Sequence, residues 1–545
     1  MAHQKLHGRA FYESLGSPKY ILAPMVDQSE FAWRLLTRSF LPPDLRTSIL
    51  AYSPMLHAKL FAEAPKYRAS HFQPLKPPLA VAQPGDAEQQ KTLDLEKDAY
   101  MDGNPQIDRP LFVQFCANDA KHFLEAAKIV QPYCDAVDLN LGCPQGIARR
   151  GNYGSFLQED WATIQLDIPV TAKMRILETK ERTLQYAQMI LDAGASIITV
   201  HGRQREQKGH NTGLADWSVL RYLREQLPQE TVIFANGNIL RHDDIQKCLD
   251  ETKADGVMTA EGNLYDPSIF ATPPPVGEEG REYWRGRDGK GGYRCDAVLR
   301  RYLDIIHKYV LQEAPPARKP LFLPSDEPVR AESDLDDNAS EDNQPPAKKQ
   351  KREEIQQPPR NGKQEKVTAA NFVAMQAHCF HILRPLVSQH HNVRDALARS
   401  RAGDIAAYEN VLTLTEKAVR EGLLAYERNP AEFEEEPENA TSEEHPSPYE
   451  SSVEAVKRCK RPYWICQPYV RPLPKEALEK GSMQLSNKAK KKLAKAEEET
   501  KKSGVEPGGK VGEVAVVESG RELANGRVEG KVKKEEVPRE GMVCG

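Results

Sequence analysis

Long apolar runs are missing from this sequence of 545 residues. No segment offers the roughly 18 uncharged apolar residues that a membrane-spanning helix needs, and the stretch MAHQKLHGRAFYESLG contains no apolar secretory core. Cysteine is sparse, with nine residues in the chain, which is not a disulfide framework and suits a reducing compartment. We therefore expect a soluble, intracellular protein with no membrane partner.

The sequence also lacks an excess of charge of either sign. It has 75 lysines and arginines against 79 aspartates and glutamates, for a formal net charge of −4. A local basic face can hold nucleic acid even when acidic segments elsewhere dominate the sum. The net charge therefore neither indicates nor excludes a nucleic-acid-binding protein.

Two common kinds of catalytic motif are absent. No G-x-S-x-G elbow occurs, so a serine hydrolase of that type is not supported. Cys459 and Cys466 in CKRPYWIC are too far apart for a zinc knuckle, and no other metal-ligand spacing is convincing. We expect no metal site.

What the sequence does contain is a regular series of short apolar segments typical of buried β-strands. Between most of them lies a segment with helical spacing of its apolar residues. Eight strands alternating with helices over about 250 residues favour a closed (β/α)8 TIM barrel over an open sheet. The predicted strands are Tyr20–Met25, Thr47–Tyr52, Leu111–Phe115, Ala136–Leu139, Thr171–Met174, Ile197–Val200, Val232–Ala235 and Gly256–Thr259.

The predicted barrel occupies the first half of the chain. It spans residues 20–275 and is preceded by an N-terminal segment, residues 1–19. A Pro-rich and acidic stretch at about residues 70–110 breaks the strand–helix rhythm, which indicates a surface insertion between the second and third strands.

The second half of the chain is more polar. Helical spacing predicts a helical domain at residues 295–426, interrupted at 315–366 by a loop with the composition of disorder. Residues 430–545 are predicted to form an acidic linker and a low-complexity, charged tail. The basic run PPAKKQKR within the interrupting loop favours an import signal over a solvated charge cluster, so we expect the protein in cytoplasm and nucleus.

Unusual polar residues follow the C-terminal ends of seven of the eight predicted strands. TIM-barrel active sites lie on the loops after these ends, and packing alone does not account for so regular a placement. We therefore expect a site at this mouth of the barrel. The segments are Ala23–Asp27, Gln114, Asn140–Pro144, Lys173–Arg175, His201–Arg203, Asn236–Asn238 and Ala260–Gly262.

Two glycines lie after the seventh and eighth strands, where TIM barrels commonly bind phosphate. Gly237 in NGN and Gly262 in AEG would let backbone N–H groups approach a phosphate closely. Either loop taken alone could be a tight turn. Their joint position favours a phosphate site.

Three charged or titratable residues at the mouth indicate a bound anion. Lys173 ends an apolar strand, and a buried lysine needs an anion or an electron-rich oxygen. The alternative is a structural salt bridge with an acidic residue of the barrel. His201 could be an ordinary core histidine, but Arg203 on the same loop favours a role toward a ligand.

Cys143 lies in a loop between a glycine and a proline. A free cysteine is usually a small buried hydrophobe, and we interpret Cys116, Cys134 and Cys248 in that way. At a loop mouth, in contrast, a thiol can act as a nucleophile or a general acid. Cys143 is therefore the candidate catalytic residue.

Seven motifs, in their order along the chain, resemble those of the tRNA-dihydrouridine synthases, and in particular of the eukaryotic subgroup that acts on D-loop uridines 16 and 17. The resemblance spans roughly residues 20–270 and does not cover the stretch 70–110, the loop 315–366 or the tail. The helical part matches less, through PYWICQPYVRP. The seven motifs are APMVD, QFCAND, DLNLGCPQ, AKMRI, ITVHGRQREQKG, ANGNI and GVMTAEGNLYDP.

The resemblance implies an FMN at the barrel mouth, reduced by NADPH or NADH. Flavin N5 would pass hydride to C6 of the target uridine, and Cys143 would protonate C5. Lys173 and Gln114 would lie at the pyrimidine edge of the flavin. The other implied cofactor-binding residues are Pro24, Met25 and Val26 beside the ring, His201 next to the cofactor, and Asn236, Gly237, Asn238, Ala260 and Glu261 at the phosphate end.

The implied substrate is tRNA, with no obligate protein partner. We expect a chain shortened to end near Phe270 to keep flavin reduction and lose activity on tRNA, because contacts to the RNA backbone outside the mouth set the register. The alternative is that the helical segment completes the core of the barrel, in which case the shortened chain unfolds. The candidate tRNA contacts are Asn140, Arg175, Arg203, Arg205 and Lys208 at the mouth, and Arg384, Arg394, Arg399 and Arg401 in the helical domain. The helical arginines could equally form a solvated face.

Two other functions remain open from the sequence. An FMN barrel oxidoreductase acting on a small molecule would share the cofactor site without needing an Arg-rich helical domain. A non-catalytic RNA-binding flavoprotein would keep the fold, although the intact Gly-Cys-Pro loop argues against it.

Overall fold

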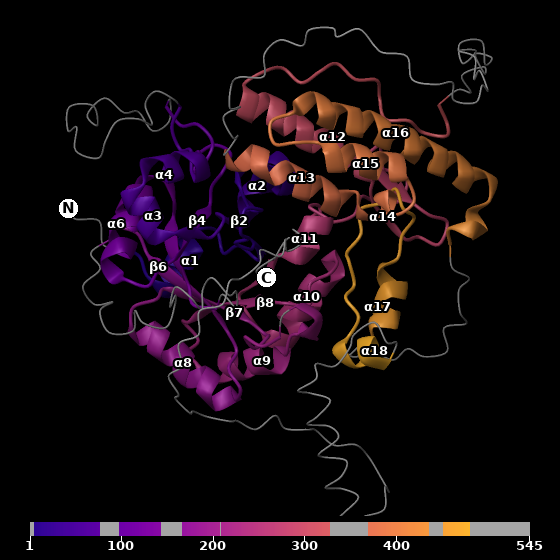
Figure 1. Cartoon of the computed structure of the whole chain (residues 1–545). Coiled ribbons are helices and arrows are strands. Elements are labelled where there is room, and N and C mark those ends of the chain that lie inside the picture. The colour runs from indigo at the N-terminus through magenta and orange to yellow at the C-terminus, as the bar shows by residue number, and fades with distance from the viewer. Residues whose placement is uncertain are drawn as a thin grey trace, which may run out of the picture. The chain divides into compact units, whose positions relative to one another are not determined.

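The computed structural model describes residues 5–76, 98–142, 166–207, 209–326, 369–434 and 451–479 (Figure 1). Eight parallel strands close into a ring, because β2 pairs with β1 on one side and with β4 on the other. The TIM barrel predicted from the sequence is therefore confirmed. The ring consists of β1 (Tyr20–Leu22), β2 (Ile49–Tyr52), β4 (Leu111–Cys116), β5 (Ala136–Asn140), β6 (Val170–Arg175), β7 (Ile197–His201), β8 (Val232–Asn236) and β9 (Gly256–Thr259), and β3 (Leu56–His57) adds a short pairing to β4.

The barrel strands are buried and helices cover them. Side-chain caps fix where several of these helices begin: Asp119, Thr179 and Asp216 each accept a hydrogen bond from a backbone N–H of the first turn. The helices of this region are α1 (Gly8–Ser14), α2 (Phe31–Ser39), α3 (Ala58–Glu63), α4 (Pro65–His71), α6 (Ala120–Val130), α8 (Lys180–Asp192), α9 (Trp217–Gln226), α10 (His242–Thr252) and α11 (Glu261–Tyr265), with 3-10 turns at Pro43–Ser48, Gln131–Tyr133 and Gly209–Asn211.

Four strands run on to a polar residue that the prediction had left in the loop. They end at Asn140, Arg175, His201 and Asn236. The apolar pattern stopped short because these end residues are polar, yet the ladder continues through them: Arg175 pairs with His201, and His201 with Asn236. The strands thus deliver polar side chains directly to the mouth.

Part of the stretch predicted to be a surface insertion is built into the barrel. Arg34 of α2 donates to Asp108 Oδ1 at 2.9 Å and to Asp102 Oδ1 at 2.8 Å, and Arg38 donates to Asp108 Oδ1 at 2.8 Å. All four side chains are buried. Burial raises the pKa of Asp102, although the charge of Arg34 opposes this. The middle of the insertion, residues 77–97, lies outside the described residues.

The helical part predicted at 295–426 is present, but its second half is not one continuous helix. Pro385 lies in the first turn of α14, where a new helix begins, and Gly403, with φ of +81°, separates α15 from α16. Helices α12, α13, α15 and α16 pack side by side (Figure 1). The elements are the hairpin β10 (Tyr283–Arg285) and β11 (Gly291–Tyr293), α12 (Cys295–Ile305) continued by a π-helical segment (Ile306–Leu311), α13 (Ala370–Ile382), α14 (Arg384–Val387), α15 (His391–Arg399), α16 (Ile405–Arg428) and a 3-10 turn (Pro430–Glu432).

The first residues of the predicted disordered loop are ordered. Residues 315–326 pack on the helical part, where Leu321 is buried and Arg318 bonds Asp304 and Glu409. Composition alone missed these contacts because ion pairs to distant residues hold the segment. Residues 327–368, which include the basic run PPAKKQKR, lie outside the described residues.

Residues 451–471 also depart from the prediction, which assigned them to the linker and tail. They form α17 (Ser452–Cys459) and then an extended arm, residues 460–471. Trp464 of the arm is fully buried against Trp284, and a Cβ at Gly422 of α16 would lie 2.4 Å from its ring. A short aromatic sequence thus anchors the arm although its flanks are polar.

The barrel and the helical part share one hydrophobic core through α2. Trp33 of α2 is fully buried and stacks on His378 of α13, with ring centroids 3.9 Å apart. The His378 ring nitrogen Nε2 lies 3.0 Å and 3.1 Å from the two carboxylate oxygens of Glu30. The described residues up to Arg471 belong to one compact unit, and a second unit begins at Pro472, where α18 (Pro474–Glu479) is described.

None of the helices in the described ranges is long and apolar enough to cross a membrane.

Candidate active site at the barrel mouth

A chain of buried polar side chains fills the barrel interior below the mouth. Gln114 of β4 donates to Asp138 Oδ2 of β5 at 2.8 Å and accepts from Asn140 Nδ2 at 2.9 Å. Thr171 of β6 donates to the other oxygen of Asp138 at 2.6 Å. Lys173 of β6, also buried, lies opposite Asn140 in the strand register. Three neighbouring strands therefore place a connected polar surface toward the mouth.

The electrostatics of this network centre on Asp138. Burial raises the pKa of Asp138 to about 6, while hydrogen bonds from Thr171 and Gln114 and the charge of Lys173 oppose the rise. The positive charge of Lys173 therefore stabilises the ionised form of Asp138, a carboxyl group inside the barrel. This interaction agrees with the structural alternative, in which Lys173 pairs with an acidic residue of the barrel. Its strand position at the mouth leaves a role toward a ligand equally open.

The loop after β8 is shaped for close approach. Gly237 has φ of +118°, and a Cβ there would lie 2.6 Å from Ala215 Cβ. Asn236 donates through Nδ2 to Met258 O at 2.9 Å. Its buried Oδ1 has no hydrogen-bond partner within the described part of the chain. A buried polar atom without a partner is costly, which indicates that a ligand or water completes this loop.

The side chain of Asn238 is used within the protein. Its Oδ1 accepts from the backbone N–H of Ala215 at 2.8 Å and its Nδ2 donates to Ala215 O at 2.8 Å. Asn238 itself has φ of +62°, a conformation that asparagine tolerates. The side chain therefore holds the loop in shape, and its backbone is the part that can face a ligand.

The loop after β9 begins at Ala260, which is buried and directly precedes α11. A Cβ at Gly262 would lie 2.3 Å from Ile239 O, so only glycine fits between the two loops. The carboxylate of Glu261 is paired with Arg471 of the arm at 2.6 Å. Glu261, one of the residues predicted at the phosphate end, therefore directs its carboxylate to Arg471 of the protein itself.

His201, the last residue of β7, lies next to Arg203 on the loop that follows. Arg203 donates to His201 Nε2 at 3.1 Å, to Gly213 O at 3.0 Å and to Asn238 Oδ1 at 3.0 Å. Because an arginine N–H can only donate, Nε2 accepts and this His201 tautomer carries its proton on Nδ1. Burial, with nearby Arg175 and Arg471, lowers the pKa of Arg203 to about 10, while the charge of Glu261 opposes the fall. Arg203 therefore faces the loop after β8, which contains Asn238 and is called the Asn238 loop below.

The other predicted substrate residues are less closely grouped. Arg175 donates to Gly142 O at 3.0 Å and to Gln204 O at 3.4 Å. Arg205 is exposed. Lys208 lies outside the described residues. The structure thus brings Arg175 to the loop after β5 and leaves Arg205 on the surface.

The candidate catalytic residue Cys143 also lies outside the described residues, but the stem of its loop is fixed. Leu141 N–H donates to Lys173 O at 2.8 Å, and Gly142 N–H donates to Asn140 Oδ1 at 3.1 Å. A Cβ at Gly142 would lie 3.1 Å from Arg175 Cγ. The chain therefore leaves β5 at the mouth in a tightly constrained conformation.

The three predicted residues after β1 have a simple arrangement. Pro24 and Met25 are buried and Val26 is half-buried. The backbone N–H of Met25 donates to Ser29 Oγ at 3.0 Å. The three residues form a short apolar segment directly after β1.

Sequence reasoning missed Asp138 and Thr171, which lie inside the strands. A usable signal was present, because side chains two residues apart on a strand point to the same face. Asp138 with Asn140, and Thr171 with Lys173, repeat this spacing on neighbouring strands. Reading the polar residues in pairs would have predicted the interior network.

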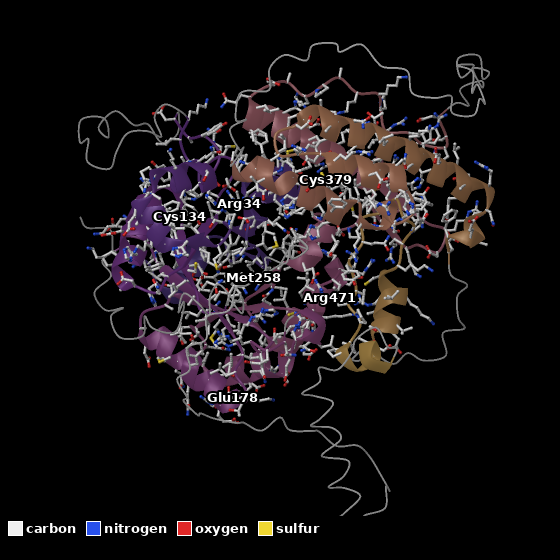
Figure 2. The ribbon with its side chains drawn as sticks, viewed as in Figure 1. Arg34, Cys134, Glu178, Met258, Cys379 and Arg471 are labelled. Carbon is white, nitrogen blue, oxygen red and sulfur yellow. The ribbon has the colours of Figure 1, made fainter. Side chains whose placement is uncertain are left out.

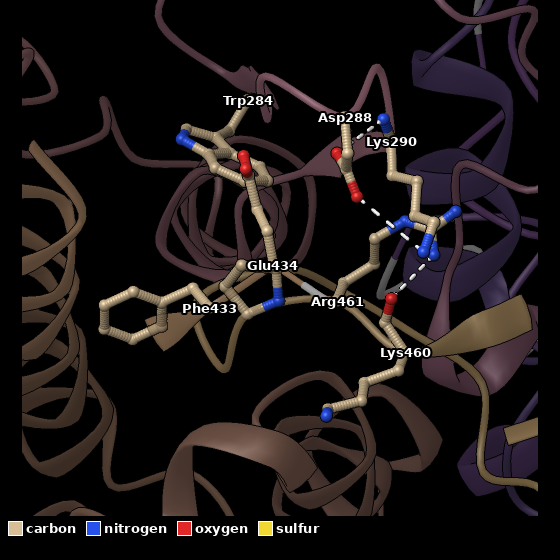
Figure 3. Close-up of a pocket in the computed structure, with 8 residues that line it drawn as sticks. Trp284, Asp288, Lys290, Phe433, Glu434, Lys460 and Arg461 are labelled. Atoms are coloured by element: carbon tan, nitrogen blue, oxygen red, sulfur yellow. Dashed lines mark hydrogen bonds and ion pairs between the residues drawn. The ribbon is translucent and has the colours of Figure 1, made fainter. Parts of the chain in front are cut away.

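A shallow hollow elsewhere differs in kind from the mouth (Figure 3). It lies where the hairpin β10–β11 meets the arm, beside Trp284 and Arg461. Two of its cations have partners within the protein: Lys290 lies 3.7 Å from the carboxylate of Asp288, and Arg461 donates to the backbone oxygens of Arg458 and Lys460. This hollow therefore has a structural explanation.

The chain was compared with known proteins. Residues 21–284 match the family model described as dihydrouridine synthase (Dus). The tRNA-dihydrouridine(16/17) synthase of Saccharomyces cerevisiae is 39% identical over 481 residues, covering 86% of this chain and 88% of the relative. The corresponding protein of Schizosaccharomyces pombe is 38% identical, covering 87% and 93%. A mouse protein named as similar to this synthase is 42% identical over 51% of this chain and 54% of its own length.

These matches run through the strands that carry the polar mouth and, in the two yeast relatives, extend over most of the chain. They agree with the order of motifs in the sequence. The chain belongs to the dihydrouridine synthase (Dus) family.

Proposed function

We propose that this protein is a tRNA-dihydrouridine(16/17) synthase, which reduces uridine to 5,6-dihydrouridine in the tRNA D-loop with NAD(P)H as reductant. The observation that carries the proposal is the length of the match to two proteins with that name, 38% and 39% identical across most of both chains. The buried polar mouth supplies the site that such a reaction needs.

The residues at the mouth fit an FMN. Gly237, with φ of +118° and Ala215 packed against it, fixes the loop after β8, and within the described part of the chain the buried Asn236 Oδ1 is an acceptor without a donor, which a bound group can supply. Lys173 and Gln114 would hold the pyrimidine edge, and His201 would lie beside the ring. When bound, FMN supplies the hydride that originates from NAD(P)H and reaches C6 of the uracil.

The residues of the chain then have distinct tasks. Lys173, fixed on β6, stabilises negative charge at the pyrimidine edge. Arg203 adds positive charge on the side of the Asn238 loop, where its hydrogen-bond partners are all neutral groups. A base must leave the tRNA stack to reach a cofactor in the barrel mouth, and Asn140 and Arg175 are the residues there that would contact it.

Cys143 donates the proton that C5 of the uracil requires. A thiol suits this task because it stays protonated until the transition state. Replacing it should abolish most product formation without disturbing the barrel, because the described hydrogen bonds that hold the stem Asn140–Gly142 come from Asn140 and Lys173.

The test is Cys143→Ala, with Cys248→Ala in α10 as the matched control. We expect Cys143→Ala to keep bound flavin, NADPH oxidation and tRNA affinity, and to lose about 10²–10⁴-fold in dihydrouridine formation. Cys248 is buried in a helix that covers the ring, and its replacement should leave turnover unchanged. Dihydrouridine formation at the wild-type rate by Cys143→Ala would show that another group is the acid.

A further inference from the structure

Three segments that are distant in the sequence meet at one edge of the barrel mouth. Tyr265 ends α11 just after β9, Arg384 begins α14, and Tyr469 and Arg471 lie at the end of the arm. We call these four residues the rim platform. Arg471 is labelled in Figure 2, and its ion pair with Glu261 ties the platform to the loop after β9.

The platform is an arrangement of cations on aromatic rings. The guanidinium carbon of Arg384 lies 3.7 Å from the centroid of the Tyr469 ring and 5.8 Å from that of Tyr265. The guanidinium carbon of Arg471 lies 5.6 Å from the Tyr469 centroid. The two tyrosine rings are 6.1 Å apart. The rings therefore hold both arginine side chains in place. Because these side chains are already ordered, they would lose little conformational entropy when a ligand binds.

Arg384 has donors to spare. Its side chain is exposed, and within the described part of the chain it makes no hydrogen bond or ion pair. An exposed arginine stacked on a ring adds only about 0.5–1 kcal/mol of stability. Fold stability is therefore a weak reason for this geometry.

The charges around the platform have one predominant sign. One carboxylate, that of Glu261, raises the pKa of the Tyr265 hydroxyl by its charge. The positive charges of Arg384 and Arg471 lower the same pKa. The positive region continues into the mouth, because Arg471 is close enough to lower the pKa of Arg203. Neighbouring His381 adds no positive charge at neutral pH, since burial lowers its pKa to about 4.

We propose that the rim platform binds the RNA strand beside the uridine that enters the barrel, with Arg384 and Arg471 on its phosphates and the half-buried Tyr469 ring against a base, while the buried Tyr265 supports the platform. Arginine pairs with phosphate through several N–H groups, and aromatic rings stack with any base. The arm is thus part of the RNA-binding surface. This inference rests on the proposed function, because it takes tRNA as the substrate.

The test compares three variants with one control. Arg384→Gln removes the cation, Tyr469→Ala removes the ring that holds it, and Tyr469→Phe keeps the ring. The control is Arg420→Gln in α16, because Arg420 is also exposed and lies over a ring, that of Phe322, at 5.0 Å. The affinity for an unmodified tRNA transcript is measured at several salt concentrations, together with flavin content and NADPH oxidation.

Arg384→Gln removes one phosphate contact. It should weaken tRNA binding by about three- to tenfold and reduce the slope of log affinity against log salt concentration by roughly 0.7–0.9. Tyr469→Ala should weaken binding in the same direction, Tyr469→Phe and Arg420→Gln should not, and flavin content and NADPH oxidation should stay at the wild-type level. Unchanged affinity and salt slope in Arg384→Gln would overturn the inference, even if Tyr469→Ala fails to fold.

The two levels of the proposal can be told apart. If the wild-type protein neither binds tRNA nor forms dihydrouridine, the proposed function fails. If it does both and Arg384→Gln is indistinguishable from it, the rim platform alone is refuted.

Discussion

The helical part meets the barrel at two places that differ in chemistry. At α2, Glu30, Trp33 and His378 are buried and satisfy one another by hydrogen bonding and stacking. At α11, the Glu261–Arg471 pair keeps 30% and 42% of its side-chain surfaces exposed. The first contact has the character of a protein core and the second that of a partly solvated surface.

The helical part is therefore not an independent module, because it shares a hydrophobic core with the barrel. Removing everything after Phe270 would expose Trp33 and the face of α2 that α12 and α13 cover. The expectation that a shortened chain keeps flavin reduction therefore needs correction, since the helical segments complete the core. Point substitutions, which leave the core covered, are the better way to separate folding from RNA binding.

The largest effect on stability should come from His378→Ala. This change leaves the Glu30 carboxylate buried without its partner, and breaking a buried pair in this way costs about 3–5 kcal/mol. It is measured as a fall in the free energy of unfolding in urea. His391→Ala, at an exposed position of α15, is the control. A loss below about 1 kcal/mol would mean that the α2 contact is not the structural one.

A second effect concerns burial inside the barrel and depends on pH. Asp138 has a pKa of about 6 in the folded protein, above its usual value in an unfolded chain. The protonated form is therefore favoured by folding, and its contribution to stability is present below about pH 4 and lost as the pH rises through about 6. A shift of about two units corresponds to about 3 kcal/mol.

The measurement is the unfolding free energy of the wild type minus that of Asp138→Asn between pH 4.5 and 7.5. The difference should fall as the pH rises, because Asn cannot titrate. A difference that stays constant across this range would contradict the account of Asp138 as a carboxyl whose ionisation is opposed by burial.

The smallest effect on stability should come from Arg471→Gln at the rim. Its ion pair with Glu261 is partly exposed, and such pairs contribute about 0–1 kcal/mol after screening by solvent. The melting temperature should therefore change little while the affinity for tRNA falls. If Arg471→Gln destabilises the protein as much as His378→Ala, the rim is a second structural contact and the comparison between the two places collapses.

The sequence was sufficient for the barrel because its strands are short, apolar and regularly spaced, and the positions of the mouth residues followed from the strand ends. It was not sufficient for the partners of those residues. The pairing of Glu261 with Arg471 joins positions 210 residues apart, and nothing local in AEG indicates it. Trp464 was assigned to a linker because its anchoring depends on Gly422 and Trp284, which only the fold brings to it.

Dihydrouridine synthesis is tested by incubating the purified protein with unmodified tRNA and NADPH and mapping dihydrouridine by mass spectrometry of the digested RNA. The account predicts that uridines 16 and 17 each gain two hydrogens, and that the reaction requires bound FMN. NADPH oxidation through FMN without dihydrouridine at either position would contradict it, and would favour a barrel oxidoreductase that acts on a small molecule.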